Sequence, residues 1–429
     1  MLTSHRHLNM HRFLIGLFAL LITTQPSYAV ETGSVRSDDG TEITYRRLPG
    51  NKQGPLFIWL PSEDGLQAAE RETARTLAEA GHENWLVDLF ESRFLPTTAS
   101  SLDKIPPSDV RVLIEAAKPT QRRVFLISSG RGAGPLLRGL HAWQLQHPQT
   151  RKTPGVILIS PQFYHQTPDP GEAAQLLPIV TQTNAPVFIL QPANSPWRWK
   201  LDQTIPALQQ SGSEVFWRLL PDVRDRFYYR PDATDIEQQL EANLVVLIHQ
   251  AALALRQWPD QPRSVTALDK QLEPLPTSKQ ERTLKAYAGD PQPPPLRLTG
   301  LEGTTYDLSD YRDEVVLVNF WASWCPPCVH EMPSMERIHN SLQDSPFTIL
   351  AVNMTEDPAT IRDFLQTKVN VTFPILLDRD GKALQQWGVF AFPTSYLIDK
   401  QGKIRYALFG SVDWERQDIL AKIESLLNE

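Results

Sequence analysis

Short apolar runs alternate with longer amphipathic segments over residues 30–256. Four of the runs have the length and composition of buried strands: "PLFIWLP" (55–61), "RVFLISS" (123–129), "GVILISP" (155–161) and "PVFILQP" (186–192). Apolar residues recur at helical spacing in segments 65–83, 107–117 and 133–147, and in a longer one at 236–258. A strand that is apolar on both faces needs cover on both faces, so this order predicts an α/β domain with a mostly parallel sheet.

A second α/β unit is predicted for residues 296–429. It opens with a buried strand, "VVLVNFWAS" (315–323). A helix (326–344), a strand (347–354), a helix (357–368), a strand-turn-helix (372–389), a hairpin (394–410) and a final helix (413–429) follow. Between the two units, residues 257–295 are rich in proline and polar residues. Consecutive prolines favour an extended, semi-rigid chain, and we therefore expect a linker there.

The first 29 residues have the three parts of an export signal. A basic segment contains Arg6 and Arg12, an apolar segment covers residues 13–23, and the small residues Ser27 and Ala29 stand where a cleavage site requires them. We expect cleavage after Ala29, which predicts a periplasmic or otherwise extracytoplasmic protein. The alternative is an uncleaved signal that anchors the protein in a membrane, although the apolar segment is short for a spanning helix.

Composition excludes some classes of partner. The chain is 41% hydrophobic and 21% charged, as is typical of globular proteins. A net charge of −7 provides no cationic surface for nucleic acid. No later apolar run reaches the roughly 18 residues of a membrane-spanning helix, so we expect no transmembrane span once the signal is removed.

The chain contains only two cysteines, Cys325 and Cys328, within "NFWASWCPPCVHEMP" (319–333). Separated by two residues, they would close a loop too small to stabilise the fold much as a structural disulfide. A structural zinc site needs four ligands, and neither His330 nor His339 completes a recognisable ligand spacing. We therefore expect redox chemistry, with no metal and no cofactor beyond the Cys325–Cys328 disulfide itself.

The cysteine pair stands where a predicted strand meets a predicted helix. Unpaired N–H groups and the dipole at a helix N-terminus favour a thiolate, and such motifs lower the thiol pKa from about 8.5 to roughly 3.5–7.5. Cys325 is predicted to be the exposed attacking thiol, and Cys328, one turn later, the more buried resolving thiol. Pro326 and Pro327 have no N–H to stabilise a thiolate, which favours a reductase over a strongly oxidising pair.

Residues 296–429 resemble the extracytoplasmic thiol-disulfide oxidoreductases of the thioredoxin fold that are called TlpA-like or ResA-like. The resemblance rests on "YDLSDYRDEVVLVNFWASWCPPCVHEMPSM" (306–335), "FTILAVNMTED" (347–357), "FPILLDRDGKALQQWGV" (373–389) and "FPTSYLIDKQGKI" (392–404). It implies a thioredoxin fold with an extra segment within about residues 344–378. It also implies reduction of protein disulfides, often in cytochrome c maturation, and a thiol electron donor in the membrane.

Residues near the cysteines carry over from this family. Pro393, preceded by Phe392, matches a cis-proline that faces the pair and binds substrate backbone; a trans proline that only begins a strand is the alternative. Glu331 matches an acidic residue placed to relay protons to Cys328, unless it is an ordinary solvent-facing glutamate. Trp324 is predicted to shield the pair and contact substrate, with a packing role as the alternative.

The order of segments in residues 30–256 resembles the α/β-hydrolase fold. That family places a nucleophilic serine in G-x-S-x-G on a tight turn, but "SSGRGAG" (128–134) puts Gly130 at the serine position. Shifting the pattern makes Ser129 the candidate and puts Arg131 where the closing glycine belongs. The segment after "EVFWRLLP" (214–221), where the catalytic base is expected, is "DVRDRFYYRPD" (222–232) and contains no histidine. The next histidine, His249, falls inside the last predicted helix of the domain, where we expect it to pack or face solvent. Aromatic residues on the loops at strand ends would either bind a partner or simply pack: Trp197, Trp199, Phe227, Tyr228 and Tyr229.

These observations predict an exported protein-disulfide reductase whose N-terminal domain is non-catalytic and binds a substrate or partner protein. The predicted partners are protein disulfides and dithiols together with a membrane thiol donor. Two other functions stay open at this point. One is a bifunctional protein with an esterase in its N-terminal half, and the other is a binding protein whose cysteines form only a reversible tether.

Overall fold

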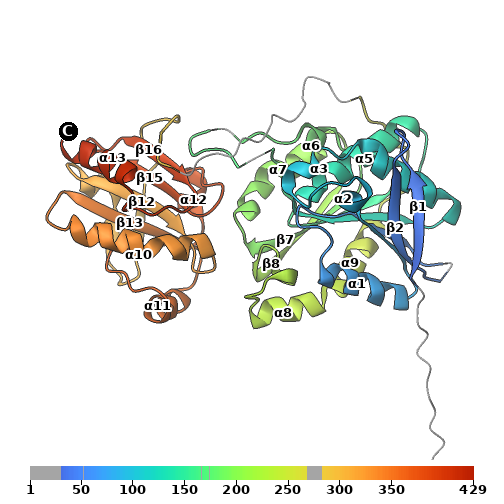
Figure 1. Ribbon diagram of the computed structural model, residues 1–429, viewed down its shortest axis with the longest axis horizontal. Coiled ribbons are helices and arrows are strands. Elements are labelled where there is room, and N and C mark those ends of the chain that lie inside the picture. The colour runs from blue at the N-terminus through green and yellow to red at the C-terminus, as the bar shows by residue number, and fades with distance from the viewer. Residues whose placement is uncertain (1–29, 52, 166, 173, 268–282) are drawn as a thin grey trace, which may run out of the picture.

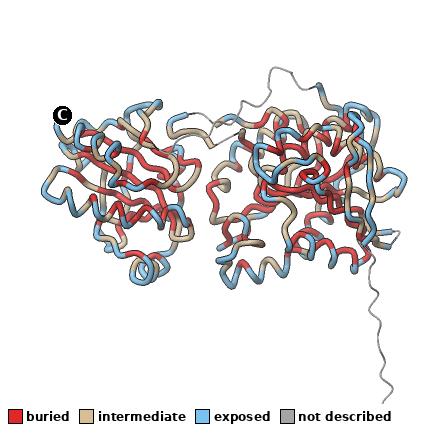
Figure 2. Tube along the Cα trace, in the orientation of Figure 1, coloured by how far each residue is buried: buried red, intermediate tan, exposed pale blue. Residues whose placement is uncertain are grey.

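Two α/β domains lie side by side in the computed structural model, which describes residues 30–429 except 52, 166, 173 and 268–282 (Figure 1). We call residues 30–256 the front domain and residues 296–429 the redox domain. The predicted export signal, residues 1–29, lies outside the described residues, as does the middle of the predicted linker. Buried residues concentrate along the strands of both domains (Figure 2).

The front domain is built on an eight-stranded sheet of order β1-β2-β4-β3-β5-β6-β7-β8. Strands β3 to β8 run parallel to their neighbours, whereas β1 and β2 form an antiparallel edge. The strands are β1 (Glu31–Arg36), β2 (Glu42–Leu48), β3 (Leu56–Trp59), β4 (Glu83–Val87), β5 (Val124–Ser129), β6 (Gly155–Ile159), β7 (Val187–Asn194) and β8 (Val215–Arg224). The mostly parallel α/β sheet agrees with the pattern of apolar runs.

Helices cover both faces of the front sheet. They are α1 (Ala68–Glu79), α2 (Leu89–Ser92), α3 (Ala99–Leu102), α4 (Pro107–Ala117), α5 (Ala133–Gln146), α6 (Pro178–Gln182), α7 (Leu201–Gln209), α8 (Asp235–Ala242) and α9 (Leu244–Leu255). Alternate residues of β3 enter two separate cores: Leu56 and Ile58 pack with α4 and α5, and Phe57 and Trp59 with α1 and α9. Each side chain of this kind contributes about 1.5–3 kcal/mol when fully buried.

The long helix predicted for residues 236–258 is divided into α8 and α9 at Asn243. The Asn243 side chain donates to the carbonyl of Gln239 at 2.7 Å, and its backbone leaves helical geometry at ψ 6°. Asparagine side chains compete with the helix for backbone hydrogen bonds, which explains the break.

The redox domain contains a second eight-stranded sheet of order β11-β10-β14-β13-β12-β15-β16-β9. Central strand β12 runs parallel to β13 and antiparallel to β15. The strands are β9 (Lys285–Ala286), β10 (Arg297–Gly300), β11 (Thr305–Asp307), β12 (Val315–Trp321), β13 (Phe347–Met354), β14 (Ile375–Asp378), β15 (Thr394–Ile398) and β16 (Ile404–Phe409). The predicted hairpin is formed by β15 and β16.

Helices also lie on both faces of this second sheet. They are α10 (Pro326–Ser341), α11 (Pro358–Thr367), α12 (Lys382–Gln386) and α13 (Gln417–Leu427). Apolar residues of α10, α11 and α13 share one core with β12, whereas α12 packs into the core on the opposite face. The segment predicted as an insertion within residues 344–378 contains β13, α11 and β14.

The described ends of the predicted linker are packed against the two domains. Arg263 forms an ion pair with Glu214 at 2.5 Å on the front domain. At the other end, β9 pairs with β16 and so extends the redox sheet. These ends therefore belong structurally to the domains, whereas the sequence predicted a single spacer over 257–295.

No helix in the described part of the chain is both long enough and apolar enough to cross a membrane.

A buried ion pair joins the end of β8 to α8 and offers a test of the front domain. Arg224 Nε donates to Glu237 Oε1 at 2.8 Å, and Glu237 is fully buried. Arg224→Ala leaves that carboxylate without its cation, and we expect the front domain to lose about 3–5 kcal/mol in urea unfolding. Arg218→Ala, at an exposed position on the same strand, should change the stability by less than about 0.5 kcal/mol. A loss below about 1 kcal/mol for Arg224→Ala would contradict this role.

Candidate functional site

The cysteine pair lies at the junction of β12 and α10. Cys325 is the N-cap residue of α10 and is joined to Cys328 by a disulfide bond. Cys325 is 5% exposed and Cys328 0%. The order of accessibility agrees with the prediction, but Cys325 is largely covered rather than openly exposed. Both sulfur atoms belong to the apolar core shared by α10 and β12.

The first turn of α10 supplies one backbone donor to Cys325 Sγ. Pro326 and Pro327 occupy its first two positions, are exposed and have no N–H. The N–H of Cys328 donates to Cys325 Sγ at 3.3 Å. A thiolate at Cys325 would therefore gain the helix dipole and one hydrogen bond, which is less stabilisation than a turn without prolines provides.

Glu331 is buried beneath the pair, on the same helical face as Cys328. Its Oε1 accepts from Asn319 Nδ2 at 2.8 Å, and its Oε2 from Trp414 Nε1 at 3.3 Å and the N–H of Val412 at 3.4 Å. Burial raises the pKa of Glu331 from 4.5 to about 8, although these three donors act against the shift. The alternative of a solvent-facing glutamate therefore does not apply. A carboxyl group with this pKa can accept or release a proton near neutral pH.

Trp324, the residue before Cys325, contacts Phe392, the residue before Pro393. The rings of Trp324 and Phe392 meet edge to face with centroids 5.9 Å apart, and both residues are half-buried. The Phe392–Pro393 peptide bond is cis, as the resemblance implied. The carbonyl of Pro393 accepts from the N–H of Gly410 at 2.9 Å. Since Phe320 of β12 pairs with Thr394 of β15, the chain before β15 lies next to the chain that leads to Cys325.

Sequence reasoning missed the polar residues that support this site. Asn319 joins Glu331 to Ser395, whose Oγ accepts from the same Nδ2 at 2.9 Å. Glu356 accepts the N–H of Ser323, in the loop before Cys325, at 2.8 Å. One signal was present in the sequence: Asn319 is the only polar residue in the apolar strand "VVLVNFW" (315–321). A polar side chain in a fully buried strand needs a polar partner, which points to a second buried polar group nearby.

In the front domain, Gly130 lies in the turn between β5 and α5, at the position that the α/β-hydrolase pattern assigns to a serine. Gly130 occupies the turn with a φ of 52°, a conformation that favours glycine. Glu63, from the loop after β3, accepts the N–H of Arg131 at 2.8 Å. A Cβ atom on residue 130 would lie 2.5 Å from Glu63 Oε2, so the glutamate fills the space that a serine there would need.

The other candidate, Ser129, also lacks a histidine partner. Its hydroxyl donates to Glu70 Oε1 at 3.2 Å, and burial raises the pKa of Glu70 to about 7. Asp225, which follows β8, accepts hydrogen bonds from Ser160 and Ser195. The cavity among these residues has a volume of about 20 Å³, enough for a water molecule and too small for an ester substrate.

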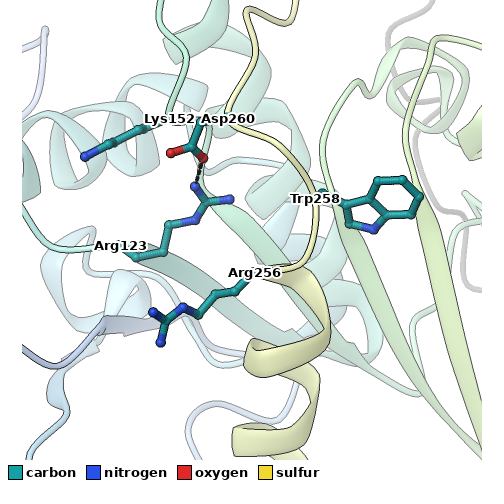
Figure 3. A pocket seen from close by; sticks show the side chains of 5 residues that line it. All are labelled: Arg123, Lys152, Arg256, Trp258 and Asp260. Atoms are coloured by element: carbon teal, nitrogen blue, oxygen red, sulfur yellow. Dashed lines mark hydrogen bonds and ion pairs between the residues drawn. The ribbon is translucent and has the colours of Figure 1, made fainter.

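A larger hollow of about 360 Å³ lies at the amino-terminal ends of the parallel strands of the front sheet (Figure 3). It is lined by Arg123, Lys152, Arg256, Trp258 and Asp260. Arg123, directly before β5, forms an ion pair with Asp260, and the Trp258 ring points away from the charged side chains in Figure 3. Because strands β3 to β8 are parallel, the loops that follow them lie at the carboxyl ends of the strands, on the side of the sheet away from this hollow.

Within the described ranges, no three His, Cys, Asp or Glu side chains are close enough together to hold a metal ion.

Comparison with known proteins agrees with the geometry of the redox domain. Residues 289–407 match the AhpC/TSA family. Thiol-disulfide oxidoreductase ResA of Geobacillus thermodenitrificans strain NG80-2 is 38% identical over 133 residues, which cover 31% of this chain and 75% of that protein. Thioredoxin-like protein YneN of Bacillus subtilis strain 168 is 38% identical over 117 residues, 27% of this chain and 67% of that protein. An exposed lipoprotein thioredoxin of Streptococcus pneumoniae strain TIGR4, for which a crystal structure exists, is 31% identical in sequence. This match has a TM-score of 0.28 and covers 31% of this chain and all of that chain.

The raised pKa of Glu331 predicts a pH-dependent stability of the oxidised redox domain. Below pH 4.5 the residue is protonated in both the folded and the unfolded chain. Between pH 4.5 and about 8 only the unfolded chain releases the proton, so the free energy of unfolding should fall by about 3–5 kcal/mol as the pH rises through this window. Glu331→Gln should remove this decline, whereas Glu424→Gln, at an exposed position on α13, should retain it. The free energy of unfolding is measured with urea at pH 5 and at pH 8. If it changes between these two pH values by the same amount in wild type and in Glu331→Gln, the assignment is contradicted.

Proposed function

The chain belongs, through its redox domain, to the family of ResA-like thiol-disulfide oxidoreductases, and we propose that it reduces disulfide bonds of extracytoplasmic proteins with Cys325 and Cys328. The observation that carries the proposal is the disulfide at the N-terminus of α10 with the buried carboxyl group of Glu331 on the face of Cys328. The export signal predicted for residues 1–29 supports the extracytoplasmic location.

The reaction begins with both cysteines reduced. The Cys325 thiolate attacks one sulfur of the substrate disulfide, a mixed disulfide forms, and the other substrate sulfur leaves as a thiolate that takes up a proton. Glu331, as a carboxylate, accepts the proton of the Cys328 thiol. The Cys328 thiolate then attacks Cys325 Sγ and releases the second substrate thiol, so two electrons pass from the pair to the substrate. The oxidised pair is returned to the dithiol by a thiol donor, which we expect at the membrane.

Reduction is the favoured direction because few hydrogen bonds stabilise the Cys325 thiolate. Strong oxidants of this fold have a reduced form that is stabilised. Here Pro326 and Pro327 remove two of the donors that would provide such stabilisation, and only the N–H of Cys328 remains at the sulfur. Cytochrome c maturation is one process in which the family implies such a reductase.

The front domain is proposed as a non-catalytic, hydrolase-like module that binds a substrate or partner protein. Its parallel sheet and the β5–α5 turn support the likeness. Gly130 in the turn and the hydrogen bond from Arg131 N–H to Glu63 support the lack of hydrolysis, since the N–H after the nucleophile forms part of the oxyanion hole in active hydrolases.

Loss of the attacking thiol is the direct test of the function. Cys325→Ser should lower the rate of insulin-disulfide reduction in the presence of dithiothreitol to the rate of dithiothreitol alone, with an unchanged far-ultraviolet circular dichroism spectrum. Cys328→Ala should also stop turnover but accumulate a mixed disulfide with insulin, because the attacking thiol is still present. Activity retained by Cys325→Ser would overturn the proposal.

The same assay separates an enzyme from a redox tether. The wild type is expected to reduce many insulin molecules per protein molecule, whereas a tether would exchange once and stop.

Hydrolysis is predicted to be absent. The wild type should turn over p-nitrophenyl acetate no faster than a protein-free buffer, because Gly130 cannot act as a nucleophile and Ser129 has no histidine base. Ser129→Ala is the control. Ester turnover by the wild type that disappears in Ser129→Ala would restore the esterase alternative.

A further inference from the structure

The front domain contacts the redox domain through the loops that follow β6 and β7. In open α/β sheets, ligands bind outside the carboxyl ends of the strands, where such loops lie. Here Tyr164 comes from the loop after β6, and Trp197, Trp199 and Lys200 from the loop after β7. Glu63 occupies the space beside Gly130 at this end of the sheet, and the loops after β6 and β7 are instead in contact with the redox domain.

Phe390 of the redox domain is held by aromatic rings of the front domain. Its ring meets Tyr164 edge to face at 4.8 Å between centroids and Trp197 at 5.3 Å. Tyr164 and Trp197 are themselves roughly parallel, with centroids 6.0 Å apart. Lys200 Nζ lies 4.4 Å from the Phe390 centroid. Phe390 is buried, so one residue of the redox domain is enclosed by three side chains of the front domain.

Two further contacts keep the domains together at this place. The Trp199 ring lies so close to Gly381 that a Cβ atom there would be 2.1 Å from it, and the Gly381 φ of 70° also favours glycine. Lys285 of β9 forms an ion pair with Asp169 at 2.7 Å. The interface therefore includes contacts from three segments of the redox domain, at Gly381, Phe390 and Lys285.

Phe390 lies in the same loop as Phe392 and Pro393, two of the predicted substrate-binding residues. Residues 389–393 are part of the connection between α12 and β15, and Phe392 packs edge to face on Trp324, the neighbour of Cys325. Contacts thus run without interruption from the front-domain rings through this loop to the residue beside the attacking sulfur.

We propose that the front domain sets the position of the loop 389–393 through Phe390, and that it thereby determines how well a polypeptide substrate docks beside Cys325. Phe390 and Trp197 are positioning residues in this account, because neither contacts the sulfur atoms in the structure. The proposal rests on the reductase function above and adds a role for the front domain that requires no ligand in its own cavity.

Steady-state kinetics of the full-length protein test the coupling. Phe390→Ala and Trp197→Ala should each raise the KM for insulin about tenfold, with a smaller change in kcat, because the loop that receives the polypeptide is no longer held. Reduction of 5,5′-dithiobis(2-nitrobenzoate), which needs no docked polypeptide, should change less than twofold. Trp197→Phe, which retains an aromatic ring, should restore most of the insulin KM.

A matched control variant and a double variant test whether the change in KM comes from the contact between Phe390 and Trp197. Phe216→Ala removes a ring that packs on Phe188 and Trp258 at the amino-terminal end of β8, and should leave the insulin KM unchanged. The double variant Phe390→Ala/Trp197→Ala should be no worse than Phe390→Ala alone, since Phe390→Ala already removes the contact between these two rings. Trp197 lies outside the redox domain, so its variants decide the matter even if Phe390→Ala unfolds that domain.

An unchanged insulin KM in Trp197→Ala, with normal wild-type activity, would overturn this inference and leave the reductase function intact. Equal losses for insulin and the small disulfide would also overturn it, because they would indicate damage to the sulfur chemistry rather than to docking. A wild type that fails to reduce insulin would overturn the reductase function, and this inference with it.

Discussion

The position of β12 between β13 and β15 determines the whole redox site. Pairing on both sides holds the strand in register up to Trp321, so the following loop and the start of α10 have a fixed origin. The same pairing places the start of β15, and with it Pro393, beside the cysteine loop. Cys325 and Phe392 are more than sixty residues apart in the chain, and it is the antiparallel register of β12 and β15 that brings their loops together.

Burial then gives this geometry its chemistry. Glu331 lies in an apolar core that also contains Cys328 and Trp414, so its charged form is disfavoured even with three hydrogen-bond donors. A carboxyl group that would be ionised on a solvent-exposed helix can therefore accept or release a proton near neutral pH. The diproline in the first turn acts on the other sulfur by limiting the hydrogen bonds available to a Cys325 thiolate. Together these features favour a pair that gives up its electrons to substrates.

The local parts of this site could be predicted from the sequence, and the long-range parts could not. A lone cysteine pair between a strand pattern and a helix pattern was sufficient to identify the redox centre, because both patterns are local. The burial of Glu331 depends on Val412 and Trp414, about eighty residues later, and helical spacing alone leaves either face possible for it. The packed ends of the predicted linker escaped prediction because β9 is only two residues long and gains its place by pairing with β16. No pattern in the sequence indicated the role of Phe390, because the side chains that it contacts belong to the other domain.

The central claim is that Cys325 and Cys328 form a reducing pair, and the midpoint potential of the pair tests it most directly. Equilibration of the full-length protein at pH 7 with glutathione or dithiothreitol buffers, followed by thiol alkylation, measures the fraction of reduced pair. The account predicts a potential near that of thioredoxin, about −270 mV, because the thiolate gains little stabilisation. A potential near that of DsbA, about −120 mV, would mark a strong oxidant and would contradict the account.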